Sequence, residues 1–155
     1  MTRDGAIVDT SVLIDFLKGK DPSAAAVAEL VTSKRIYTTG IIMAELLQGA
    51  RTAREEAYAT ELLDALPALE VTSALWMKTG RLACSLRRKG ITLPLSDIAI
   101  SILAMEHNLS VFSLDSHFHR IPGLTLYKAQ KRRAFHVALA PRPSSRRGPK
   151  APFPS

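Results

Sequence analysis

Short apolar runs alternate with stretches of helical periodicity along most of the chain. The run Ala6–Val8 ends at an aspartate, and Val12, Leu13, Phe16 and Leu17 then follow at the spacing of one helix face. The same alternation continues to Tyr127. It predicts strands over 6–8, 35–38, 69–72, 109–114 and 124–127, and helices over 10–17, 23–33, 41–49, 52–65, 73–89 and 97–107.

This order of elements predicts the fold class. Strands that are separated by helices are typical of βαβ units, in which a parallel sheet is covered on both faces. We therefore expect an α/β fold of three layers, α/β/α, around a short and mostly parallel sheet of about five strands. Gly90 is expected to end the long helix in a left-handed conformation, and Ser96 is expected to cap the next helix.

The formal net charge of +7 is concentrated at the end of the chain. Residues 1–127 hold 14 acidic and 13 basic residues, whereas 128–155 hold eight basic residues, no acidic residue and five of the nine prolines. This change predicts a folded domain over 1–127 and a basic, Pro/Arg-rich and partly disordered tail over 128–155. The tail has three interpretations: added affinity for RNA phosphates, with Arg132 and Arg133 as candidate contacts, affinity for another acidic partner, or an inert extension.

Composition excludes several protein classes. A hydrophobic content of 46% is too high for a wholly disordered chain. The single cysteine, Cys84, excludes a disulfide framework and a multi-cysteine zinc site. No apolar run approaches the roughly 20 residues of a membrane helix. The chain begins almost directly with a strand pattern, so we expect no signal peptide and a cytoplasmic protein.

Four carboxylates occupy positions that point to one site. Asp9 and Asp115 each stand where an apolar strand ends, Asp97 opens a helix, and Glu45 lies among apolar neighbours that suit an unpaired charge poorly. In parallel α/β sheets the carboxyl ends of the strands and the adjoining helix starts face one crevice. A cluster of carboxylates favours a hard divalent cation such as Mg²⁺ or Mn²⁺, and such a site suits hydrolysis of phosphodiesters. Each aspartate alone also has a structural explanation in turns and helix starts.

Four segments resemble, in order and spacing, the motifs of PIN-domain ribonucleases. They are residues 7–15 (IVDTSVLID), 44–49 (AELLQG), 95–104 (LSDIAISILA) and 113–123 (SLDSHFHRIPG). The resemblance covers about residues 5–127 and implies a PIN-like, Rossmann-like nuclease domain. Length and pattern are similar to VapC toxins of type II toxin–antitoxin modules.

The resemblance implies roles for individual residues. Asp9, Glu45 and Asp97 would be the core metal-binding and catalytic acids, with Asp115 as the fourth, and Thr10, Ser11 and Ser113 would position water or the scissile phosphate. It also implies a Mg²⁺- or Mn²⁺-dependent endoribonuclease, a homodimer, an RNA substrate, and a cognate antitoxin whose C-terminal segment occupies the active-site groove.

Other interpretations remain open. Arg87, Arg88 and Lys89 are candidate RNA contacts, but cations are also expected in the last turn of a helix. His117 and His119 are not assigned a role, because metal-bound water makes a histidine base unnecessary. An aspartyl-nucleophile phosphatase would need a second aspartate where Ser11 stands. The main alternative is a non-catalytic PIN-like module that binds RNA or protein.

Overall fold

The computed structural model describes residues 4–130. Most of the predicted basic tail, including Arg132 and Arg133, lies outside the described residues. Within them, no helix is long and apolar enough to cross a membrane.

Four parallel strands form the sheet, in the order β3-β2-β1-β4. The central strand β1 (Ala6–Val8) pairs with β2 (Ile36–Thr39) on one side and with β4 (Ser110–Phe112) on the other. β3 (Ala68–Leu69) adds two residues to the far edge of β2. All three residues of β1 are fully buried, which explains why this strand reads as a continuous apolar run rather than an alternating one.

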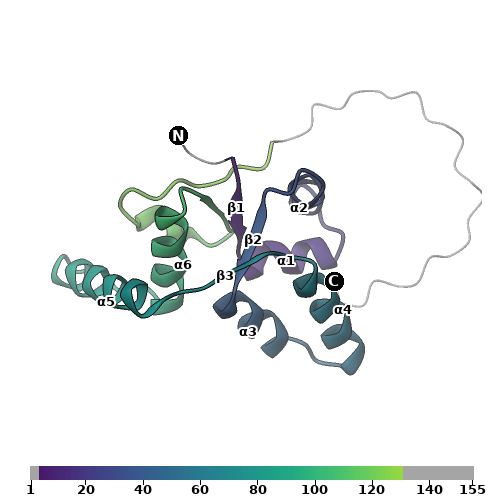
Figure 1. Ribbon diagram of the computed structural model, residues 1–155, viewed down its shortest axis with the longest axis horizontal. Helices are drawn as coiled ribbons and strands as arrows, with labels where there is room; N and C mark the ends of the chain where they lie inside the picture. The colour runs from purple at the N-terminus through teal and green to yellow at the C-terminus, as the bar shows by residue number, and fades with distance from the viewer. Residues whose placement is uncertain (1–3, 131–155) are drawn as a thin grey trace, which may run out of the picture.

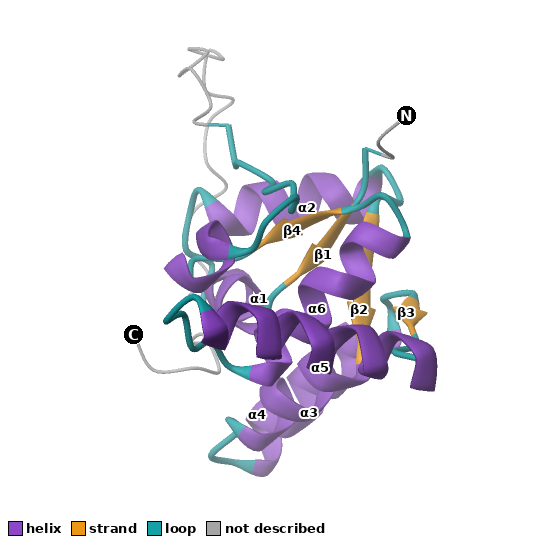
Figure 2. Ribbon diagram, turned by 90° about the vertical axis from the view of Figure 1, so that its left-hand side faces the viewer, coloured by secondary structure: helices purple, strands orange, loops and turns teal. Residues whose placement is uncertain are grey.

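Helices cover both faces of the sheet. In Figure 1, α1, α2 and α4 lie to the right of the strands and α5 and α6 to the left; Figure 2 views the molecule from that left side, with α5 and α6 in front of the sheet. The three-layer α/β/α prediction is confirmed. The bounds are α1 Thr10–Leu17, α2 Ser23–Thr32, α3 Gly40–Gln48, α4 Ala53–Asp64, α5 Ser73–Arg88, α6 Leu95–Glu106 and a short 3-10 helix, η1, Ser116–Arg120.

Two apolar clusters hold these layers together. The larger one joins the strands to α1, α2, α3 and α6, and a smaller one packs Leu86 of α5 and Leu93 against Ile98 of α6 and Ile121. The second cluster fixes α5, α6 and the end of η1 relative to one another. It therefore sets the position of the segment that follows β4.

The predicted count of about five strands is corrected to four within residues 4–130. Residues 124–127 form only an isolated bridge, in which Val111 pairs with Leu126, because the chain meets β4 at a single position. The third strand lies at Ala68–Leu69 rather than 69–72, because Thr72 already caps α5: its hydroxyl accepts the Leu75 N–H. In both places the strand-like sequence pattern continues beyond the residues that pair with a neighbouring strand.

The helix boundaries are predicted more closely than the strands. Gly90 has a φ of +79°, as expected for the residue that follows α5. Ser96 is not the cap of α6, which begins at Leu95 with Pro94 at the N-cap position. Asp97 therefore lies inside the first turn of α6, where a carboxylate is favoured by the helix dipole.

Candidate metal-binding active site

Three of the four predicted acids lie where strands end and helices begin. Asp9 follows β1 directly, Asp115 lies just beyond β4, and Asp97 projects from the first turn of α6. Asp9 and Asp97 are only 7% and 9% exposed, whereas Asp115 is exposed. The parallel arrangement of β1 and β4 puts their carboxyl ends at the same edge of the sheet, and this brings residues about 100 positions apart to one place.

The Asp9 carboxylate is held by two serine hydroxyls. Asp9 occupies the N-cap position of α1, but its side chain forms no cap hydrogen bond. Its Oδ2 instead accepts hydrogen bonds from Ser113 Oγ at 2.6 Å and from Ser11 Oγ at 3.2 Å. The shorter of these bonds joins the carboxylate to the segment after β4, and the longer one joins it to the first turn of its own helix.

The same hydroxyls join α1 to the loop after β4. Ser113 Oγ accepts the Asp115 N–H at 3.0 Å, and Ser11 Oγ accepts the Leu114 N–H at 3.1 Å. The two serine oxygens are 3.3 Å apart. Ser11 and Ser113, predicted to position water or phosphate, thus have a defined structural contact with the acids themselves.

Glu45 lies at the edge of this group. It projects from α3, is half-buried, and accepts a hydrogen bond at 3.1 Å from the hydroxyl of Thr10, the residue next to Asp9. Asp97, Asp115 and His117 place ligand atoms within 4.8 Å of one another, but neither Glu45 nor Asp9 belongs to that group. The structure therefore brings Asp97 and Asp115 together directly and links Glu45 to Asp9 through Thr10.

Electrostatics in the cluster disfavour negative charge on Asp97. Burial raises the pKa of the Asp97 carboxyl above its ordinary value, and the charges of Asp9 and Asp115 raise it further. A hydrogen bond from His117 acts in the opposite direction on this pKa. These mutually repelling carboxylates, of which Asp9 and Asp97 are buried, fit a divalent cation, because its charge offsets both the burial and the repulsion.

His117 belongs to the site, and sequence reasoning left it unassigned. Its Nδ1 is 3.0 Å from Asp97 Oδ2 and 3.2 Å from Asp115 Oδ1. A signal was present: His117 follows Asp115 by two residues, so a turn at the strand end returns its side chain to the same crevice. His119 has the same residue type but is exposed and forms no ion pair or side-chain hydrogen bond with another described residue.

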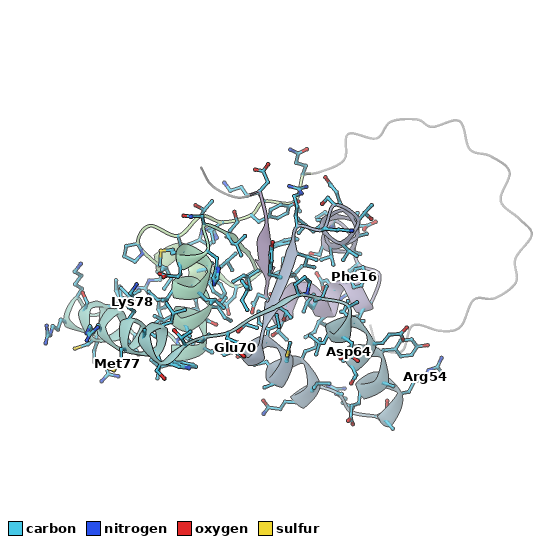
Figure 3. All side chains as sticks on the ribbon, viewed as in Figure 1. Phe16, Arg54, Asp64, Glu70, Met77 and Lys78 are labelled. Carbon is cyan, nitrogen blue, oxygen red and sulfur yellow. The ribbon has the colours of Figure 1, made fainter. Side chains whose placement is uncertain are left out.

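The cationic triplet Arg87, Arg88 and Lys89 directly follows Leu86, which belongs to the same apolar cluster as Ile98, the neighbour of Asp97. It is exposed at the end of α5, and none of these side chains forms an ion pair or hydrogen bond with another residue of the range 4–130. Nearer the start of α5, Lys78 pairs with Glu106 of α6 at 3.2 Å. Figure 3 shows Met77 and Lys78 on this helix, at the end of the molecule opposite Arg54 of α4.

Comparison with known proteins agrees with this arrangement. A family model described as "PIN domain" matches residues 6–124. Among solved structures, a chain of the DNA-bound VapBC complex from Salmonella typhimurium has 26% identity and a TM-score of 0.70, covering 81% of this chain and 98% of that one. A chain of VapBC2 from Rickettsia felis, bound to a promoter DNA fragment, has 21% identity and a TM-score of 0.68, covering 79% and 96%.

A third similar structure is VapC20 from Mycobacterium tuberculosis, described as a toxin that cleaves the sarcin-ricin loop. It has 17% identity and a TM-score of 0.58, and the alignment covers 74% of this chain and 93% of that one. No curated protein sequence matches the chain significantly. The predicted resemblance to PIN-domain proteins, and among them to the VapC type, is confirmed by the family match and by these neighbours.

Proposed function

Because this chain belongs to the PIN domain family, we propose that it is a divalent-metal-dependent endoribonuclease and the toxin of a VapBC-type toxin–antitoxin pair. One observation carries the proposal. Asp9, at the end of β1, and Asp97, at the start of α6, are both buried, and burial together with the charges of Asp9 and Asp115 raises the pKa of Asp97. A structural role alone gives no reason to gather repelling carboxylates at the ligand-binding edge of a parallel sheet.

We assign Asp9, Glu45, Asp97 and Asp115 as the residues that hold Mg²⁺ or Mn²⁺. When bound, such an ion supplies Lewis-acid stabilisation of phosphate oxygens and lowers the pKa of water. Ser113 and Ser11 would orient Asp9 toward the ion, and Thr10 would orient Glu45, through the hydrogen bonds that these hydroxyls donate. The reaction is in-line attack of water on an RNA phosphodiester, leaving 5′-phosphate and 3′-hydroxyl ends.

We further propose that a cognate antitoxin covers this site in the cytoplasm. The solved neighbours from Salmonella typhimurium and Rickettsia felis are VapBC complexes. Leu95 and Leu114, which lie close in sequence to Asp97 and Asp115, are 58% and 57% exposed. In this proposal these leucines supply apolar contacts to the antitoxin at the edge of the site.

A homodimer is part of the same proposal. Trp76 of α5 is 45% exposed and borders a hollow of about 590 Å³ that is lined mainly by apolar residues, among them Ile41, Met43 and Val71. A half-exposed tryptophan beside an apolar hollow suits a protein interface. Arg87, Arg88 and Lys89, and Arg132 and Arg133 of the tail, are proposed as sequence-independent contacts to RNA phosphates.

The test is to map RNA ends after controlled expression, and to repeat the cleavage with purified protein in Mg²⁺ or Mn²⁺. Asp9→Asn and Asp97→Asn are expected to abolish cleavage with the fold intact, and the matched variant Asp64→Asn, on the exposed end of α4, is expected to cleave normally. Full activity in Asp9→Asn or Asp97→Asn contradicts the site assignment.

The alternative is a non-catalytic module that binds RNA or protein and keeps the acids for structure. A Mn²⁺ titration separates the two functions. A nuclease binds Mn²⁺ far more tightly than its Asp97→Asn variant, whereas equal affinity of the two proteins favours the binding module.

A further inference from the structure

We propose that His117 is a nitrogen ligand of the divalent ion at this site, and that it gives the site a preference for Mn²⁺ over Mg²⁺. The inference rests on the proposed function for the presence of an ion. It goes beyond that function by adding a ligand that is not a carboxylate and by assigning the choice of metal to one side chain.

The candidate ligand atoms of His117, Asp97 and Asp115 lie close together. Nδ1 of His117 is 3.0 Å from Asp97 Oδ2 and 3.2 Å from Asp115 Oδ1. Adjacent ligands of an octahedral ion, at metal–ligand distances of about 2.1 Å, are separated by roughly 3.0 Å. The nitrogen is therefore already at the spacing of a neighbouring ligand from each of two carboxylate oxygens, and the three residues place their ligand atoms within 4.8 Å of one another.

The position of the ring is built into the backbone. The His117 N–H donates to Asp115 Oδ1 at 2.9 Å, which begins η1 and turns the imidazole toward Asp97. The next residue, Phe118, is 1% exposed and anchors η1 in the core. His117 is thus held by the hydrogen bond to Asp115 on one side and by the buried Phe118 on the other, whereas His119 on the same short helix is exposed. Substitution of His119 therefore serves as a matched control for substitution of His117.

The chemistry of the donor sets the expected selectivity. Mg²⁺ prefers oxygen ligands, and replacing one oxygen by an imidazole nitrogen favours first-row transition ions over Mg²⁺. The gain follows the Irving–Williams order, so it is larger for Co²⁺ than for Mn²⁺. If carboxylate oxygens alone held the ion, the removal of His117 would leave the preference between Mn²⁺ and Mg²⁺ unchanged.

The competing explanation is that His117 only neutralises the acids when no metal is bound. As a cation it would hydrogen-bond to both carboxylates and compete with the metal for them. Its removal would then raise the affinity for Mg²⁺ and Mn²⁺ alike. A nitrogen ligand gives the opposite result, because its removal weakens Mn²⁺ binding and leaves Mg²⁺ binding less affected.

The experiment measures metal binding directly on the full-length protein, without RNA. Isothermal titration with Mn²⁺ and with Mg²⁺ is carried out on the wild type, His117→Ala, His117→Asn and His119→Ala. We expect His117→Ala to weaken Mn²⁺ binding by about tenfold or more and Mg²⁺ binding by clearly less. His117→Asn, which offers an oxygen from a similar position, is expected to retain Mg²⁺ affinity and lose the Mn²⁺ preference. His119→Ala is expected to match the wild type.

A spectroscopic measurement identifies the ligand itself. Electron spin echo modulation of the Mn²⁺-loaded wild type is expected to show coupling to an imidazole ¹⁴N, which is retained in His119→Ala and lost in His117→Ala. Wild-type Mn²⁺ binding without that coupling, or unchanged or tighter Mn²⁺ binding by His117→Ala, overturns the inference while leaving the proposed nuclease intact. A wild type that binds no Mn²⁺ overturns both proposals together.

Discussion

Replacement of Ser113 by alanine tests whether the hydroxyls around Asp9 prepare the site for a metal. Ser113 Oγ donates to Asp9 Oδ2 at 2.6 Å, a length typical of a hydrogen bond between a hydroxyl and an ionised carboxylate. It also accepts the Asp115 N–H. The substitution therefore removes one contact to each of two proposed ligands and leaves Asp9 with the longer bond from Ser11.

The structure sets the size of the effect. A hydrogen bond to a charged group contributes about 1.5–3 kcal/mol, and loss of a group that orients a metal ligand lowers metal affinity by about 10- to 100-fold. We expect Ser113→Ala to weaken Mn²⁺ binding within this range. Because Ser11 still donates to Asp9, the metal-free protein is expected to lose only about 1–2 kcal/mol of its free energy of unfolding.

The assay compares three proteins by Mn²⁺ titration and thermal unfolding: the wild type, Ser113→Ala and Ser113→Thr. Threonine retains the hydroxyl and is expected to restore most of the affinity lost in the alanine variant. Mn²⁺ affinity of Ser113→Ala equal to that of the wild type would refute the reasoning. So would a threonine variant that binds as weakly as the alanine variant, because the hydroxyl would then not be the group that matters.

Three further outcomes are expected. The raised pKa of Asp97 means that the folded state holds this proton more tightly than the unfolded state does. The metal-free protein is therefore expected to lose stability as the pH rises above the ordinary carboxyl pKa. Melting temperatures measured against pH test this, and Asp97→Asn is expected to remove the loss. Trp76→Glu is expected to convert the proposed homodimer to a monomer in light scattering, whereas Tyr58→Ser, at an exposed position of α4, leaves the mass unchanged. Deletion of 128–155, which removes eight basic residues, is expected to weaken RNA binding and flatten its salt dependence without abolishing cleavage, and a truncated protein that binds metal but does not cut RNA contradicts this.

Much of the fold is predictable from local sequence. The apolar run Ala6–Val8 is buried on both sides as the central strand, and its length and composition predict that directly. The end of α5 is predicted to within one residue, because Gly90 stops the helical periodicity. Residues 124–127 and the cap of α6 are predicted wrongly, because a β-like pattern does not reveal how many partner residues a strand meets, and Pro94 competes with Ser96 for the same cap.

The candidate site, like the fold, is only partly predictable from the sequence. The sequence by itself determined which residue types stand at strand ends and helix starts, and hence that Asp9, Asp97 and Asp115 face one edge of a parallel sheet. Only the tertiary structure decided which hydroxyl meets which carboxylate, since Ser113 reaches Asp9 across 104 residues of sequence. It also placed His117 between Asp97 and Asp115. The physical reason is that periodicity reports burial and direction, whereas a hydrogen bond depends on distances of a few tenths of an ångström, which arise only when the strands and helices pack together.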